Sequence, residues 1–240
     1  MRIAVSSSPF RRPLAAGELT QLEWVEHCAS VLGVDGIVAD LSDFPRTDGE
    51  YVAQLRKVAV DLGIVPFGID APTLLDPTTA EQARDAALLL ASTFGAAIVR
   101  APVPPPGEVP PATFVATAAA AKGASKVGKR LNVTLVVPAR PGTLADDAAG
   151  LRHLLKDVDS AWLRACPRAA DEHLVWGTKD RFPTFEANIE DDPQTIVARA
   201  ARSWLILDAP ATLEHPWERL GTAIEALRAV RPELRVTAER

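Results

Sequence analysis

Residues 20–40 read TQLEWVEHCASVLGVDGIVAD, a helical pattern followed directly by a strand pattern. Thr20, with Glu23 three residues later, has the spacing of a capping box, so a helix is expected to begin here. Apolar residues then recur at helical spacing until Gly33, a residue type that commonly ends helices. Gly36 to Asp40 follows as an apolar run, which is typical of a strand covered on both faces. The stretch therefore predicts one repeat unit of a parallel α/β protein.

The same alternation continues along the chain, with a repeat of roughly 30 residues, the size of a βα unit. Apolar strand patterns are expected at residues 3–5, 36–40, 64–69, 97–100, 133–137, 162–166, 174–176 and 204–207. Helical patterns are expected at residues 20–32, 48–62, 76–94, 112–129, 144–156, 193–201 and 216–230. Eight strands is the number that closes a barrel, so the sequence predicts one (β/α)8 TIM barrel domain over residues 1–240.

The repeat is irregular between residues 167 and 180. Few residues separate the expected sixth and seventh strands, so either the sixth helix is degenerate, reduced to a turn around Arg168 to Glu172, or residues 174–176 belong to that helix. The alternative architecture is a seven-stranded or doubly wound open sheet, although no G-x-G-x-x-G loop follows the first strand. Asp180 to Asp192 has little regular pattern and is expected to be a loop, either a lid or an inert surface loop.

Composition and charge exclude several classes of protein. The chain has 240 residues, 48% of them hydrophobic, and its net charge of -5 does not favour a general nucleic-acid-binding surface. No apolar run approaches the roughly 20 residues needed to cross a bilayer, and the N-terminus lacks a signal-peptide pattern. Cys28 and Cys166 lie far apart, which argues against a disulfide scaffold. We expect a cytoplasmic protein that binds neither nucleic acid nor membrane. The sequence leaves open whether the chain forms a homo-oligomer.

Four phrases of the sequence resemble the xylose-isomerase-like barrels, in the order and at the spacing of that superfamily. Leu32 to Val38 (LGVDGIV) resembles its "lGvdgvE" phrase, and Phe94 to Arg100 (FGAAIVR) resembles its "lGa..vr" phrase. Pro141 to Asp146 resembles the segment after its fifth strand, and Lys179-Asp180 resembles the HxKD end of its seventh strand. The superfamily includes sugar-phosphate isomerases and epimerases and endonuclease IV. The resemblance therefore implies the (β/α)8 fold and a small carbohydrate as substrate.

The resemblance also implies a divalent metal ion, held between carboxylates and a histidine at strand ends, that polarises substrate oxygens. The expected ligands fall instead on Val38 (second strand), Pro138 (fifth), Pro167 or Arg168 (sixth) and Gly177 (seventh). Asp208 keeps a carboxylate after the eighth strand, and Asp40 lies two residues beyond the second-strand position. Because one or two carboxylates cannot make such a site, the sequence predicts that the metal site is largely lost and that no cofactor is bound.

Cationic side chains gather at the carboxyl ends of the expected strands, where a barrel builds its site. The candidates for substrate binding are Arg100, Arg140, Arg168 and Lys179. Guanidinium groups grip phosphate or carboxylate bidentately, so these residues predict a pocket for a small anionic carbohydrate. The alternative is a structural ion network in which the cations pair with Asp40, Asp70 and Asp208.

The sequence leaves two functions open. The first is a divergent sugar or sugar-phosphate isomerase or epimerase, in which Asp208 or Asp40 is the candidate catalytic base and cationic side chains stabilise the enediolate oxygen. The second is a pseudoenzyme or ligand-binding protein that keeps the barrel without the chemistry. An endonuclease-IV-like role is disfavoured, because it needs a multi-zinc site rich in His and Glu. Cys166 is expected to be either a nucleophile activated by Arg168 or a buried, inert thiol.

Overall fold

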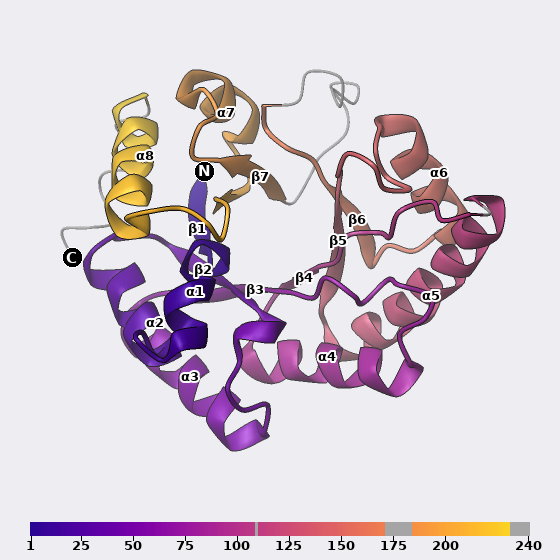
Figure 1. The fold of residues 1–240 in the computed structure, drawn as a ribbon, viewed down its shortest axis with the longest axis horizontal. Coiled ribbons are helices and arrows are strands. Elements are labelled where there is room, and N and C mark those ends of the chain that lie inside the picture. The colour runs from indigo at the N-terminus through magenta and orange to yellow at the C-terminus, as the bar shows by residue number, and fades with distance from the viewer. Residues whose placement is uncertain (109, 171–183, 231–240) are drawn as a thin grey trace.

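The computed structural model describes residues 1–108, 110–170 and 184–230. The strands are β1 (Arg2–Ser6), β2 (Gly36–Asp40), β3 (Val65–Asp70), β4 (Ile98–Arg100), β5 (Thr134–Pro138), β6 (Leu163–Cys166), β7 (Thr184–Asn188) and β8 (Trp204–Asp208). The helices are α1 (Arg11–Ala16), α2 (Gln21–Ser30), α3 (Gly49–Asp61), α4 (Glu81–Phe94), α5 (Pro110–Leu131), α6 (Ala148–Val158), α7 (Pro193–Ala200) and α8 (Pro216–Val230), with short 3-10 helices η1 (Ser8–Phe10) and η2 (Leu41–Asp43). Helices α2 to α8 surround the strands in chain order (Figure 1). Among the described helices, none is both long and apolar enough to span a bilayer.

Parallel pairing joins the strands into one eight-stranded sheet in the order β6-β5-β4-β3-β2-β1-β8-β7. The two edge strands meet at a parallel bridge between Arg168 and Glu186. The amide of Ala169 donates to the carbonyl of Glu186 at 2.8 Å, and the amide of Glu186 donates to the carbonyl of Pro167 at 3.0 Å. The sheet is therefore a nearly closed barrel, and the predicted (β/α)8 fold is confirmed.

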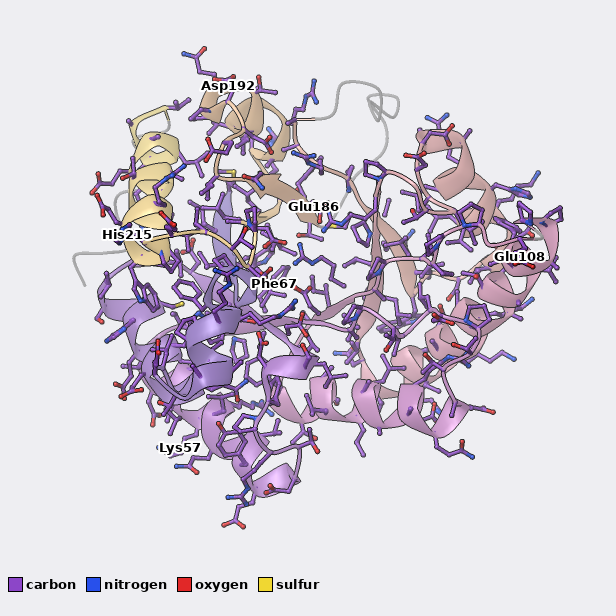
Figure 2. All side chains as sticks on the ribbon, in the orientation of Figure 1. Lys57, Phe67, Glu108, Glu186, Asp192 and His215 are labelled. Carbon is purple, nitrogen blue, oxygen red and sulfur yellow. The ribbon has the colours of Figure 1, made fainter. Side chains whose placement is uncertain are left out.

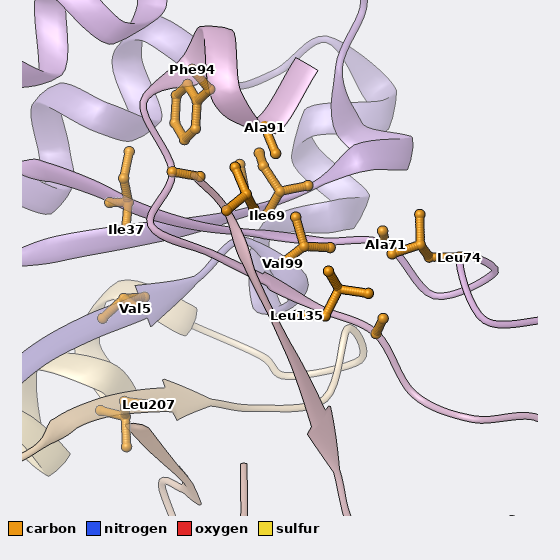
Figure 3. Close-up of a cluster of buried hydrophobic side chains, with 14 of the residues drawn as sticks. Val5, Ile37, Ile69, Ala71, Leu74, Ala91, Phe94, Val99, Leu135 and Leu207 are labelled. Atoms are coloured by element: carbon orange, nitrogen blue, oxygen red, sulfur yellow. The ribbon is translucent and has the colours of Figure 1, made fainter. Parts of the chain in front are cut away.

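The main hydrophobic core lies between the barrel and its helices. Outward strand residues such as Val5 and Leu207 are fully buried there. Figure 3 shows part of this layer, with Val5, Ile37, Ile69, Val99, Leu135 and Leu207 from the strands and Ala91 and Phe94 from α4. Burying one such aliphatic or aromatic side chain contributes about 1.5–3 kcal/mol. Most of the apolar burial is thus outside the barrel, and the interior is left to a smaller set of side chains.

Inward apolar side chains fill the amino-terminal half of the barrel. They are Ala4, Val38, Phe67, Ile98, Val136, Cys166 and Ile206, with Trp204 packed against them. Trp204 stacks on Phe67, with ring centroids 4.1 Å apart and planes 15° from parallel. Gly36 makes room for this ring, because an added Cβ would lie 2.9 Å from a Trp204 ring carbon. We call this cluster the barrel floor. Because it fills the interior below, inward polar side chains are found towards the carboxyl ends of the strands.

The start of α2 follows its local signal, whereas α4 and α6 both begin later than expected, α6 at Ala148 instead of Leu144. The capping box at Thr20 is present: the Glu23 amide donates to Thr20 Oγ1 at 3.2 Å, and the Thr20 amide donates to Glu23 Oε2 at 2.8 Å. The helix expected from Asp76 begins only at Glu81. Asp76 instead makes a turn, in which its Oδ1 accepts the amide of Thr78 at 2.8 Å. A local side-chain bond to the backbone has replaced the expected helix start.

The seventh strand is the main correction to the sequence prediction. The seventh strand predicted at residues 174–176 lies outside the described residues, and the strand that pairs with β8 is Thr184–Asn188, which was not predicted. The loop predicted for residues 180–192 is wrong over β7, and its residues 180–183 lie outside the described residues. The described residues between β6 and β7, 167–170, form no helix, and the rest of the expected turn lies outside them. The strand was missed because its inward residue is Glu186, which breaks the apolar run.

Candidate active site

The last inward position of most strands is polar. Side chains alternate along a strand, so a residue two positions beyond a floor residue points to the same interior. Ser6, Asp40, Arg100 and Asp208 lie two positions after Ala4, Val38, Ile98 and Ile206, and apolar Pro138 takes the same position after Val136. The register pairs Asp40 with Asp70 and Asp70 with Arg100, so these side chains form one layer. In Figure 2, Glu186 of β7 lies towards the middle of the ring of helices, whereas Lys57 and Glu108 lie at its edge.

Arg100 joins three carboxylates in this layer. The residue is only 5% exposed. Its Nε donates to Asp70 Oδ1 at 2.6 Å, and its Nη2 donates to Asp70 Oδ2 at 2.5 Å. Nη2 also donates to Asp208 Oδ2 at 2.8 Å, and Nη1 donates to Glu186 Oε2 at 3.1 Å. One guanidinium therefore connects β3, β7 and β8.

Arg140, which follows β5, approaches Glu186 as a second cation. Its Nη2 donates to Glu186 Oε2 at 2.9 Å, and its Nη1 pairs with Glu186 Oε1. The Arg140 side chain is 36% exposed, while that of Glu186 is 3% exposed. Arg140 thus lies at the solvent side of the layer, and two guanidinium groups face the three carboxylates of Asp70, Glu186 and Asp208.

The buried charges shift one another's pKa values. Burial raises the pKa of Asp70 above its ordinary value, although Arg100 opposes the shift. Burial likewise raises the pKa of Glu186, against the influence of Arg140 and Arg100. Burial disfavours the charge of Arg100, but Asp70, Asp208 and Glu186 together hold its pKa well above the usual range. Arg100 therefore stays charged, while Asp70 and Glu186 take up a proton more readily than ordinary carboxyl groups.

Asp40 belongs to a neighbouring cluster. Its Oδ1 accepts the Ser42 hydroxyl at 2.6 Å and the Ser42 amide at 2.9 Å, and its Oδ2 pairs with Arg11. Arg11 Nε also lies 3.4 Å from Asp43 Oδ1, and the Ser7 hydroxyl donates to Asp43 Oδ2 at 2.7 Å. The cluster ties α1 to the end of β2, so both oxygens of the candidate base Asp40 are engaged.

The structure brings together some of the predicted cationic residues. Arg100 and Arg140 meet at Glu186, and Arg100 makes the pairs with Asp70 and Asp208 that the ion-network alternative named. Arg168 Nη2 donates instead to Asp191, at 3.1 Å and 3.4 Å from its two carboxylate oxygens. Lys179 lies outside the described residues. The three described arginines are thus each paired with carboxylate.

Two adjoining clefts open over the charged layer. The larger, of about 260 Å³, is lined by Ser8, Arg140, Arg168, Glu186, Ala187, Asn188, Asp208, Ala209 and Pro210. The smaller, of about 170 Å³, is lined by Ser8, Asp40, Asp70, Pro72, Arg100, Pro102, Pro138, Arg140 and Asp208. Arg140 and Asp208 border both clefts. A ligand at this mouth would therefore contact the cluster around Arg100 directly.

Glu186 is the site residue that sequence reasoning missed. Its signal was the alternation of outward Phe185 and Ala187 around a charged residue, which is the pattern of a strand with one polar face. Gly177, to which the resemblance assigned the seventh-strand ligand, lies outside the described residues. Cys166 ends β6 as a buried thiol whose pKa burial raises further, so it is not an activated nucleophile.

The donor set does not fit a divalent metal ion while Arg100 is in place. Among residues 1–108, 110–170 and 184–230, no group of three or more His, Cys, Asp or Glu side chains is arranged to hold a metal. Asp70, Glu186 and Asp208 all contact the guanidinium of Arg100, which occupies the space between them. A cation placed beside it would meet a like charge in a buried setting, which is unfavourable.

No protein-family model and no curated protein matches the sequence, but solved structures match nearly the whole chain. D-psicose 3-epimerase with D-tagatose from Clostridium cellulolyticum H10 aligns with a TM-score of 0.73 and 10% identity, covering 96% of this chain and 99% of that one. The probable 3-DHS dehydratase AsbF of Bacillus anthracis aligns with a TM-score of 0.71 and 10% identity, covering 95% and 98%. A xylose isomerase domain containing protein from Salmonella typhimurium aligns with a TM-score of 0.68 and 13% identity, covering 95% and 97%.

The chain has the fold of the xylose isomerase-like barrels. At these identities the likeness establishes the fold and not the reaction. One of the three neighbours is named an epimerase and another a dehydratase, so the shared barrel supports more than one chemistry. The function of this chain must therefore be argued from its own side chains.

Proposed function

We propose that this protein is a sugar isomerase- or epimerase-type enzyme that works without a resident divalent metal ion. The observation that carries the proposal is the pair Glu186 and Asp208, which lie on neighbouring strands, contact the same guanidinium and line the same cleft. Two carboxyl groups beside one cleft can remove a proton from a sugar carbon and return it. The epimerase among the structural neighbours supports the same class of reaction.

Burial and charge favour different roles for the two carboxyl groups. Asp208 is proposed as the base, because its side chain is 21% exposed, against 3% for Glu186. Glu186 is proposed as the acid, since its raised pKa favours the protonated form. When Asp208 takes a proton from the carbon beside a carbonyl, negative charge develops on the carbonyl oxygen, and the proton held by Glu186 neutralises it while Arg140 stays paired with the resulting Glu186 carboxylate. Return of a proton to that carbon or its neighbour completes epimerisation or isomerisation without any redox partner.

Charge pairing favours a neutral sugar as the substrate. Arg140 is engaged by Glu186, and Arg168 is engaged by Asp191. A phosphate group would have to displace one of these carboxylates before it could bind. Hydroxyl groups, in contrast, can accept from and donate to the pairs as they stand. Because the sequence predicted an anionic carbohydrate, the experiment below compares neutral sugars with sugar phosphates.

The test is proton exchange at carbon, followed by NMR in D2O with neutral ketoses and aldoses and with their phosphates. We expect deuterium to enter beside the carbonyl of a neutral sugar, and EDTA to leave the rate unchanged. D208N should slow exchange by about 10²–10⁴-fold, the usual contribution of general acid–base catalysis. D61N, which alters an exposed carboxylate paired with Lys57, is the matched control and should have no effect. Absence of exchange with every sugar would overturn the enzyme proposal, and inhibition by EDTA would overturn metal independence.

A non-catalytic sugar-binding protein is the second candidate. The observation that favours it is that Asp208 and Glu186 both accept hydrogen bonds from guanidinium groups, so carboxylate oxygens that a base would use are already engaged. This candidate predicts a rise in melting temperature with neutral sugars and no deuterium incorporation. Measuring melting temperature and deuterium incorporation with the same sugars in the same buffers therefore distinguishes the two functions.

A further inference from the structure

Arg100 is placed in the barrel mouth as a bound cation would be. Its guanidinium is surrounded by carboxylates from three strands, Asp70 of β3, Glu186 of β7 and Asp208 of β8. The Ser6 hydroxyl lies 3.5 Å from Nη2 on a fourth side. A side chain this deeply buried keeps its charge only because attraction to these carboxylates offsets the free-energy cost of removing the guanidinium from water. The cluster therefore depends on one fixed positive charge at its centre.

The geometry around Nη2 is close to that of an oxygen-ligated cation. This atom lies 2.5 Å from Asp70 Oδ2 and 2.8 Å from Asp208 Oδ2. Bonds from Ca²⁺ to oxygen are about 2.3–2.6 Å long, so small inward shifts of the carboxylates would bring them to bonding distance. The nearby Nη1 is 3.1 Å from Glu186 Oε2, which places a third carboxylate beside the same point.

We infer that Arg100 is the resident cation of this site and that its guanidinium excludes a divalent metal ion from Asp70, Glu186 and Asp208. The resemblance to metal-dependent barrels implies a cation among strand-end carboxylates, and here β4 supplies that charge covalently. Arginine suits the position, because its planar group donates to several carboxylates at once and does not lose its proton. Arg100 is thus a positioning residue, which fixes the carboxylates that border the clefts.

The inference predicts that removing Arg100 creates metal affinity. R100A leaves three carboxylates and an emptied volume, whereas R100Q leaves a shorter, neutral side chain that still donates a hydrogen bond. We expect both variants to bind Mn²⁺ at least roughly ten-fold more tightly than the wild type, as oxygen ligands favour such ions. Electron paramagnetic resonance of free Mn²⁺ measures the binding, and the change in melting temperature on adding Ca²⁺ or Mn²⁺ measures the stabilisation.

R140A is the matched control, because it changes the net charge by the same amount but leaves Arg100 in place. It should bind Mn²⁺ no more tightly than the wild type, and adding D208N to R100A should abolish the gained affinity. The inference is overturned if the wild type binds Mn²⁺ as tightly as R100A, or if R140A gains the same affinity. It is also overturned if folded R100A and R100Q bind no metal, or if both stay unfolded with the ions present. The measurement involves no turnover, so a failure of the inference can be told from a failure of the enzyme proposal, which is tested by deuterium exchange.

Discussion

The two ends of the barrel interior are built from the same strands and have opposite chemistry. At the floor, Phe67, Trp204 and Ile206 pack as an apolar plug. At the mouth, Arg100 and Asp208 stand two residues further along their strands and belong to a buried ion cluster. Phe67 of the floor and Glu186 of the mouth both lie inside the ring of helices in Figure 2. A shift of two residues, one pleat of a strand, separates the stabilising layer from the candidate site.

The floor and the mouth should therefore respond to different perturbations. Apolar packing depends on volume and is indifferent to pH, whereas an ion cluster depends on charge balance. The mouth pairs Arg100 and Arg140 with three carboxylates, so removing one cation leaves a buried charge uncompensated. The floor loses only contacts when a side chain is trimmed.

The largest effect is expected at the centre of the mouth. R100A should lower the free energy of unfolding by about 3–5 kcal/mol at neutral pH, because it leaves buried carboxylates without their partner. Urea denaturation measures the loss. R164A, at an exposed position on β6, is the control and should change stability by less than about 0.5 kcal/mol. Equal effects of the two substitutions would show that the cluster is not held by Arg100.

The pH dependence of stability should come from the mouth. Asp70 and Glu186 have raised pKa values in the folded protein, so above about pH 4 the folded state holds protons that the unfolded state has released. The free energy of unfolding should therefore fall as pH rises through this window, by at most about 1.4 kcal/mol per pH unit for each group. E186Q should reduce that slope and D61N should not. Parallel slopes for wild type and E186Q would contradict the assignment.

Overpacking the floor should have a smaller effect. In G36A the new Cβ would lie 2.9 Å from the Trp204 ring and 3.0 Å from the Val65 carbonyl oxygen. We expect a loss of about 1–3 kcal/mol, without a change in the pH slope. G123A is a glycine substitution in α5 with no atom within 4 Å of the new Cβ, and it should stabilise by up to about 1 kcal/mol. Thermal denaturation of the pair tests whether the floor is as tightly packed as described.

The smallest effect is expected from trimming the floor. I206V should destabilise by about 0.5–1.5 kcal/mol at every pH, since it removes one buried methyl group. V60A removes apolar atoms from an exposed position on α3 and should change stability by less than about 0.5 kcal/mol. A pH-dependent loss in I206V would show that floor and mouth are coupled rather than separate layers.

The local patterns predicted the elements whose signal is carried by neighbouring residues. Apolar runs located β1 to β6 and β8, and the capping box located the start of α2. They failed at β7, where a buried glutamate interrupts the run, and at α4, where Asp76 prefers a turn. Residue type and spacing carry no information about partners that are distant in the sequence. Glu186 is compatible with the barrel interior only because Arg100 and Arg140 are there to meet it.

The sequence alone determined the alternation of helix and apolar strand, because hydrophobic periodicity is set by backbone geometry within each element. It also determined which charged residues end the strands, and hence that Arg100, Arg140 and Asp208 belong to the mouth. Only the tertiary structure decided which charges pair, because that depends on the closure of β7 beside β8 and on distances across the barrel. Arg100 and Arg140, which were expected to bind an anion, are held by carboxylates from other strands, and this pairing is a property of the closed barrel rather than of any single segment.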